Sequence, residues 1–298
     1  MGYLSIPNLY RPEAQAILEF KRLFATEKIH GTSASVIWKD GKLSFFSGGE
    51  SHGRFVTLFD AAKLEALFTE KFGPDTPVTI YGEAYGGKQQ GMSGTYGKEL
   101  RFVAFDVKIG DSWLAVPKAC ALVESMGLEF VSWKEIPSDL TSIDLERDRF
   151  SEQARRNGVE GDHIREGVVL RPPFEVTLNN GERLIAKHKR AEFSERTSKH
   201  PGLLDPAKIA VLEEAEAISA EWVTPMRLEH VLDHLKAALG RDVMIQDMPK
   251  VIAAMTEDVL REAAGEIVES KDAKKAIGHK TVKLFKARLD NQLRAMIQ

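Results

Sequence analysis

Short apolar runs separated by turn residues fill the first two thirds of the 298-residue chain. The runs at 33–38 and 43–47 flank Lys39–Lys42 (KDGK), and an Asp-Gly pair between two strand-like runs predicts a β-hairpin. Apolar spacing predicts further strands at 78–83, 101–107, 167–170 and 183–189, and helices at 59–72, 117–126 and 145–157. This part of the chain is therefore expected to be an α+β domain of antiparallel sheets with flanking helices.

The pattern changes near residues 200–202 (His-Pro-Gly), and only helical spacing follows. Within 226–239 the apolar residues recur every three or four positions, which is typical of a helix with one buried face. Helices are expected over 206–217, 225–239, 249–269 and 273–297. We therefore predict two domains, one at 1–202 and a small all-helical domain at 203–298.

Composition places the chain among ordinary soluble proteins, with 43% hydrophobic and 29% charged residues. No apolar run is long enough to span a bilayer, and the first residues lack the pattern of a signal peptide. Cys120 is the single cysteine, so an internal disulfide is excluded and a cysteine-based zinc site is disfavoured. We expect a cytoplasmic protein, monomeric and without a membrane partner.

The net charge of −3 does not favour nucleic-acid binding by the whole surface. A local basic patch can still bind phosphates, and basic residues gather between Lys271 and Arg294. The simpler interpretation of this cluster is a solvated helix face.

Two sequence motifs contain lysines that are candidate catalytic residues. The first is EKIHGT at residues 27–32, which places Lys28 three positions before a glycine, and the second is KHK at residues 187–189. Because residues two apart on a strand share a face, Lys187 and Lys189 should point to one side and His188 to the other. Two lysines held together repel each other unless an anion lies between them, so this strand favours a phosphate ligand.

Three further segments carry polar or aromatic residues on predicted strands. Glu166 precedes the apolar run GVVL at 167–170, and its carboxylate offers the hard oxygen that Mg²⁺ prefers. Glu83 ends the strand 78–83, and strand alternation places Phe105 on the face opposite Ala104 and Asp106. An aromatic ring is a suitable stacking platform, while a buried aspartate needs a partner. A core phenylalanine is the alternative for Phe105.

The order of these motifs resembles that of the covalent nucleotidyltransferases, the superfamily of polynucleotide ligases and capping enzymes. Within it, EKIHGT is similar to the motif of the RNA ligase 2 family typified by bacteriophage T4. Ligases and capping enzymes of other families carry a β-barrel after the K-x-K strand, whereas this chain shows helices there. The resemblance implies an ATP-grasp-like nucleotidyltransferase domain followed by a helical RNA-positioning domain.

The resemblance also implies roles for individual residues. Lys28 would be the covalent nucleophile, supported by the family histidine at His30, and Lys187 and Lys189 would bind phosphates. The family arginine normally follows a serine about twenty residues beyond the nucleophile; here two glycines follow Ser47, and Arg54 is the next arginine. Arg54 is therefore given this role. The remaining contacts implied are Glu27, Glu83 and Phe105 to the nucleotide, and Glu166 and Asp106 to Mg²⁺, which Mn²⁺ can replace.

The implied reaction is ATP-dependent joining of RNA ends. Lys28 would form a lysyl–AMP, AMP would pass to a 5′-phosphate end, and a 3′-hydroxyl would displace it. The RNA substrate would be a nicked duplex or a broken strand, as in RNA repair. The alternatives are a DNA ligase, a capping guanylyltransferase, which would be labelled by GTP, and a catalytically idle protein that binds RNA ends. The intact lysines argue against the last.

Overall fold

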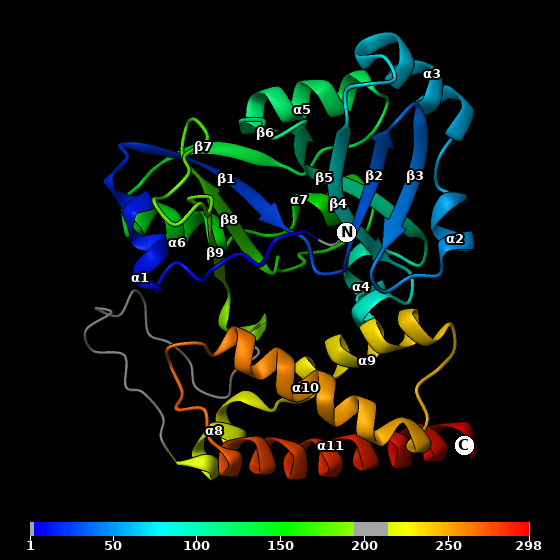
Figure 1. Cartoon of the computed structure of the whole chain (residues 1–298), viewed down its shortest axis with the longest axis vertical. Coiled ribbons are helices and arrows are strands. Elements are labelled where there is room, and N and C mark those ends of the chain that lie inside the picture. Colours follow the sequence, from blue (N-terminus) through cyan, green and yellow to red (C-terminus); the bar gives the residue numbers. More distant parts are fainter. Residues whose placement is uncertain (1–2, 194–213, 298) are drawn as a thin grey trace. The chain divides into compact units, whose positions relative to one another are not determined.

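A computed structural model describes residues 3–193 and 214–297 (Figure 1). The chain divides into two compact units, residues 1–190 and 191–298, which are described separately below. The predicted domain boundary at 202/203 and most of the predicted helix 206–217 lie outside the described residues.

Unit 1 contains two sheets in which all neighbouring strands are antiparallel, as the sequence predicted. The five-stranded sheet has the order β3 (Lys42–Ser47), β2 (Thr32–Lys39), β4 (Val78–Gly86), β5 (Leu100–Ile109) and β6 (Ser112–Trp113). The four-stranded sheet has the order β7 (Trp133–Pro137), β1 (Arg22–Lys28), β8 (Gly167–Arg171) and β9 (Ala186–Lys189). The α+β prediction is therefore confirmed, although β9 is shorter than the predicted strand 183–189.

One face of the five-stranded sheet is covered by helices α3 (Ala61–Phe72) and α5 (Val116–Ser125). Phe68 of α3 stacks on Trp38 of β2 with ring centroids 5.7 Å apart, and both side chains are buried. The opposite face carries polar residues such as Tyr81 and Glu83. The shorter helices of unit 1 are α1 (Pro12–Gln15), η1 (Ala16–Glu19), α2 (His52–Val56), η2 (Gln89–Gly91) and α4 (Ser93–Tyr96).

The predicted helix at 145–157 is wrong as a single element. Two helices occupy this region, α6 (Leu140–Arg147) and α7 (Glu152–Arg156). Ser151 has an extended backbone and its side chain accepts a hydrogen bond from Ala154 N–H, so it caps a new helix in the middle of the predicted one.

A β-bulge in β5 also changes the predicted arrangement of side chains. Ala104 pairs with Gly82 and Asp106 with Tyr81, so Phe105 is an extra residue on β5. Because Gly82 and Tyr81 are consecutive on β4, Ala104 and Asp106 lie on opposite faces of the sheet. The prediction that they share a face is wrong, since simple alternation does not anticipate the extra residue.

A buried ion pair joins the two sheets of unit 1. Arg171 of β8 lies with its Nη1 atom 2.9 Å from Asp106 Oδ1 on β5, and both side chains are at most 2% exposed. The Arg171 Nη2 atom also donates a 3.0 Å hydrogen bond to the carbonyl of Phe105, the bulged residue. Asp106 further pairs with Arg183 Nη1 at 2.7 Å, so two cations offset one buried carboxylate.

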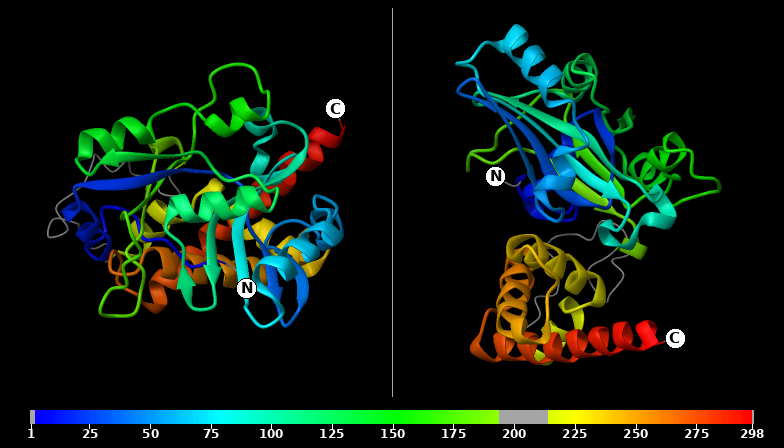
Figure 2. Two further views of the ribbon diagram at one scale, coloured as in Figure 1. Left: turned by 90° about the horizontal axis from the view of Figure 1, so that it is seen from above. Right: turned by 90° about the vertical axis from the view of Figure 1, so that its right-hand side faces the viewer.

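Unit 2 contains the helices α8 (Ala215–Trp222), α9 (Pro225–Leu239), α10 (Met248–Glu262) and α11 (Lys271–Ile297), with the short turns η3 (Ala191–Phe193) and η5 (Ile245–Asp247). They enclose a separate apolar core that includes Trp222, Val251 and Phe285. Figure 2 shows α11 running along the other helices of this unit. The all-helical prediction is confirmed for the described residues, none of whose helices is long and apolar enough to cross a membrane.

Replacing Arg171 with alanine should lower the free energy of unfolding by about 3–5 kcal/mol, because it leaves the Asp106 carboxylate buried with one partner fewer. Urea unfolding of the full chain measures this. Arg22 pairs with Glu135 at 3.1 Å with both side chains largely exposed, so Arg22→Ala should cost about 1 kcal/mol or less. Equal effects of the two substitutions would contradict a special role for the buried pair.

Candidate active site

Strand register places two of the predicted lysines in one row of the four-stranded sheet. Lys28 on β1 pairs with Gly167 on β8, and Gly167 pairs with Lys189 on β9. Gly167 has a φ of +154°, and a Cβ atom there would lie 2.2 Å from the carbonyl oxygen of His188. Only glycine fits this position, so no side chain separates Lys28 from Lys189.

The carboxylate of Glu166, the residue before Gly167, lies between the two lysines. Its Oε2 atom is 2.9 Å from Lys28 Nζ and 3.2 Å from His30 Nδ1, and its Oε1 atom is 2.9 Å from Lys189 Nζ. Glu166 is 1% exposed, whereas the Lys28 side chain is 23% exposed. The structure therefore brings four of the predicted site residues together, with three basic side chains around the buried carboxylate of Glu166.

The charge of Glu166 depends on its basic neighbours. Burial by itself would raise the pKa of this carboxyl, but Lys189, Lys28 and His30 together outweigh burial and hold the pKa well below its usual range. Glu166 is therefore ionised near neutral pH. It acts as the shared counter-ion of three basic side chains that approach from β1, the segment after β1, and β9.

Glu83 on β4 belongs to the same electrostatic cluster. Burial raises the pKa of its carboxyl to about 8; the charge of Glu166 also raises it, while Lys28, Lys189 and a hydrogen bond from the Gly31 backbone act against the shift. Gly31 lies so close to β4 that a Cβ atom would meet the Ala84 carbonyl oxygen at 2.4 Å. The glycine of the EKIHGT motif thus lets the segment between β1 and β2 lie close against β4.

Two residues next to the cluster face the other side of the four-stranded sheet. The Glu27 carboxylate accepts hydrogen bonds from Ser151 Oγ at 2.5 Å and from Glu152 N–H at 3.0 Å, at the start of α7. His188 Nε2 is 2.7 Å from Asp144 Oδ1 on α6, so it faces away from Lys189, as strand alternation predicted. The structure does not bring the Glu27 side chain to the Glu166 cluster.

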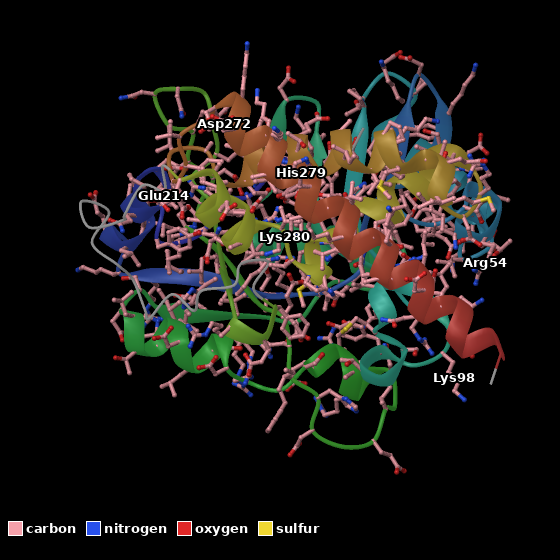
Figure 3. All side chains as sticks on the ribbon, turned by 90° about the horizontal axis from the view of Figure 1, so that it is seen from below. Arg54, Lys98, Glu214, Asp272, His279 and Lys280 are labelled. Atoms are coloured by element: carbon pink, nitrogen blue, oxygen red, sulfur yellow. The ribbon has the colours of Figure 1, made fainter. Side chains whose placement is uncertain are left out.

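Lys187 and Arg54 hold different positions relative to this cluster. Lys187 is two residues from Lys189 on β9 and pairs with Val169, so it lies on the same face of the sheet as Lys189. Arg54 on α2 is 61% exposed and pairs with Glu50 at 3.3 Å; it lies at the periphery in Figure 3. The structure shows no contact between Arg54 and the Glu166 cluster.

Phe105 and Asp106 lie on the site-facing side of β5 but not in the Glu166 cluster. The ring of Phe105 contacts Tyr3 edge-on at a centroid distance of 4.9 Å. Asp106 accepts hydrogen bonds from Tyr3 Oη at 2.5 Å and Arg183 Nη1 at 2.7 Å, in addition to its Arg171 pair. Its carboxylate is thus engaged by protein groups and lies apart from Glu166.

Sequence reasoning missed several residues that support the site. Tyr96 is buried, and its Oη atom accepts a 3.3 Å hydrogen bond from the backbone N–H of His30. Arg171 could have been anticipated, because it lies four residues after Gly167 on one strand and so shares its face, and because Asp106 required a cation. Tyr3 and Tyr96 carry no comparable signal in the sequence.

The sequence profile of the RNA ligase family matches residues 21–189, which is more than half of the chain. The chain therefore belongs to the RNA ligase family. The matched region contains all of the Glu166 cluster and both sheets of unit 1. A comparison with curated proteins gave no match.

Solved structures similar to this chain include RNA ligases of Naegleria gruberi. A mutant with ATP and Mn has a TM-score of 0.49 and 16% identity, over 65% of this chain and 57% of that one, and the enzyme with PPi gives the same values. A mutant in its apo form has a TM-score of 0.47 and 17% identity, over 63% and 55%. This chain thus spans little more than half the length of those ligases, and likeness at this level says nothing about activity.

The raised pKa of Glu83 predicts a pH-dependent stability. In the unfolded chain this carboxyl ionises near 4.5, and in the folded chain near 8, so folded molecules bind an extra proton between these values. The contribution of Glu83 is thus complete below about pH 4.5 and is lost as pH rises to about 8. We expect the melting temperature of Glu83→Gln, relative to wild type, to rise between pH 5.5 and pH 8.5 in ligand-free protein.

The matched control is Glu65→Gln on the exposed face of α3, which should leave the pH profile of the melting temperature unchanged. A difference between Glu83→Gln and wild type that does not vary with pH would contradict the prediction.

Proposed function

We propose that the chain is an ATP-dependent RNA ligase that joins 3′-hydroxyl and 5′-phosphate ends, of the type found in the RNA ligase 2 family. The observation that carries the proposal is the Glu166 cluster. In it, the motif lysine Lys28 meets Lys189 across one buried carboxylate, inside the region that matches the RNA ligase profile. Two amines facing one anion form a suitable site for a phosphate chain.

Lys28 is the nucleophile in this proposal. Its Nζ atom attacks the α-phosphorus of ATP, a nitrogen–phosphorus bond forms, the bond to the β-phosphate oxygen breaks, and pyrophosphate leaves. A lysine attacks only as the neutral amine, and the 2.9 Å contact with Glu166 favours the charged amine. The Lys28–Glu166 pair must therefore separate before attack. Lys189 and Lys187 then face the phosphates, whose developing charge they stabilise.

Glu166 has the properties expected of a ligand for a divalent cation. It is buried and ionised, and its oxygens lie 2.9 Å from Lys189 Nζ and 2.9 Å from Lys28 Nζ. An ionised carboxylate supplies the hard oxygen ligands that suit Mg²⁺ or Mn²⁺. When bound, the cation would offset phosphate charge. Binding the cation would also occupy the Glu166 oxygens that now pair with Lys28 and Lys189.

The remaining predicted residues are proposed to act at different distances from the reacting atoms. Glu83 and Phe105 would contact the sugar and base, and Arg54 would have to approach the phosphates from its exposed position on α2. Glu27 and Asp106 are engaged by protein groups, so in this proposal they support the site: Glu27 fixes β1 to α7, and Asp106 fixes β5 to β8.

Unit 2 is proposed to hold the RNA. Exposed basic residues recur every three or four positions along α11 and therefore share one face; Asp272, His279 and Lys280 mark this helix in Figure 3. Lys280 and Arg288 make contacts within unit 2: Lys280 donates a hydrogen bond to the Ala220 carbonyl, and Arg288 pairs with Glu229. The basic face comprises Lys271, Lys275, His279, Lys283 and Lys286.

Replacing Lys28 with alanine should abolish transfer of label from α-labelled ATP to the protein, because no other amine can form the lysyl–AMP. A denaturing gel after incubation with ATP and Mg²⁺ measures this. Lys21→Ala, an exposed lysine just before β1, serves as the control and should label normally. Persistent labelling of Lys28→Ala would refute the assignment, and labelling by GTP in place of ATP would favour a capping enzyme.

Replacing Lys275, Lys283 and Lys286 together with alanine should weaken nick sealing while leaving lysyl–AMP formation unchanged. Each lost phosphate contact should also reduce the slope of log affinity against log salt by about 0.7–0.9. The measurement is sealing of nicked RNA by pre-adenylylated protein at several salt concentrations.

The matched control replaces Lys39, Lys42 and Lys71, exposed lysines of unit 1, with alanine. If the control triple variant loses as much sealing as the α11 variant, the effect is one of total charge, and the basic face has no specific role.

A further inference from the structure

Aromatic and charged side chains surround Tyr3 near the start of the chain. Its ring lies edge-on to Tyr81, Phe105 and Trp113, with centroid distances of 5.1, 4.9 and 5.7 Å. Its Oη atom donates to Asp106 Oδ2 at 2.5 Å and accepts from Arg183 Nη1 at 3.0 Å. The ring is therefore fixed both by neighbouring rings and by two charged groups.

Phe105, one of these rings, stands at the bulge of β5 close to the site. Residues on either side of the bulge pair with Gly82 and Tyr81 on β4, and Glu83 follows directly on the same strand. Bulges redirect side chains, and here Phe105, Asp106 and Tyr81 all reach Tyr3 from one side of the sheet. The half-buried ring of Phe105 thus lies on the side of the sheet that carries Tyr81.

The same N-terminal segment also contacts the strand that carries the lysines. Leu9 N–H donates to the Lys187 carbonyl at 2.9 Å, and Lys187 N–H donates to the Pro7 carbonyl at 2.9 Å. Asn8 and Lys187 form a parallel bridge. In Figure 1 this segment runs from the N label towards α1. Residues 3–9 therefore support the strand of Phe105 at one end and the strand of Lys187 at the other.

We propose that Tyr3 is a positioning residue for the nucleotide base, acting through Phe105. This inference rests on the proposed function, in which Phe105 stacks on the base of ATP. The rings of Tyr3 and Phe105 meet edge to face at an interplanar angle of 78°, so Tyr3 fixes the Phe105 ring without stacking parallel on it. The rings of Tyr81 and Trp113 hold the Tyr3 ring against Phe105, so Phe105 is in position before the nucleotide arrives, while the hydrogen bonds to Asp106 and Arg183 add to the stability of the segment.

The test measures lysyl–AMP formation at increasing ATP concentration for wild type, Tyr3→Leu and Tyr3→Phe. Tyr3→Leu removes the ring and should raise the KM for ATP about threefold to tenfold, the loss expected for one aromatic pair. The rate at saturating ATP should stay within about twofold of wild type, because Lys28 and Glu166 are untouched. Tyr3→Phe keeps the ring and should restore the KM, although its melting temperature falls.

Phe68→Leu is the matched control, since Phe68 packs on the far face of the same sheet and should lower stability without changing the KM for ATP. If Tyr3→Leu does not fold, Tyr3→Met, which has a similar volume and no ring, takes its place. An unchanged KM in the folded variant overturns the inference, and a lower KM shows that the ring obstructs the base. A KM raised equally in Tyr3→Phe assigns the effect to the hydroxyl and also overturns it.

The proposed function can fail separately from this inference. If wild type does not label with ATP, both are wrong. If wild type labels, Lys28→Ala does not, and the KM of Tyr3→Leu equals that of wild type, only the role of Tyr3 is refuted.

Discussion

One buried carboxylate organises unit 1. Glu166 is the counter-ion of Lys28, His30 and Lys189, which belong to different segments, and without it three basic groups would face each other in a poorly solvated place. The cost of burying Glu166 is offset only while these partners stay within hydrogen-bonding distance. The charge of Glu166 therefore fixes the position of β9 relative to β1. Gly167 lies between these two strands, where no larger residue fits. An anionic ligand that draws the lysines away must supply a cation for Glu166 in exchange.

A second buried carboxylate fixes the five-stranded sheet to the four-stranded one. Asp106 is the counter-ion of Arg171 and Arg183, as Glu166 is of the lysines. The difference is that both arginine side chains are themselves almost fully buried. The guanidinium group of Arg171 also donates a hydrogen bond to the carbonyl of Phe105, the bulged residue. The bulge, the ion pair and the aromatic cluster are thus directly connected.

The sequence predicted the elements of the fold better than their irregularities. Alternation along β9 correctly predicted that His188 and Lys189 face opposite sides of the sheet, because consecutive side chains of a regular strand always do. It failed at Ala104 and Asp106, where one extra residue turned a side chain to the other face, and helical spacing failed at Ser151, where a cap begins a new helix. The cluster around Glu166 followed from motifs, but Tyr3 and Tyr96 did not, since their roles depend on contacts between segments distant in sequence.

The order of strands in the four-stranded sheet has a consequence for how the protein is made. Lys28 and Glu166 are 138 residues apart, and β1 lies between β7 and β8, which both come much later in the chain. During synthesis β1 has no neighbouring strand in its sheet until those segments leave the ribosome, and β9 can contact β8 and residues 7–9 only after it has itself been synthesised. Closing such long loops is slow, so the five-stranded sheet, whose hairpins are local, can form first. A nascent chain therefore cannot assemble the complete lysine cluster before residue 189 has been translated.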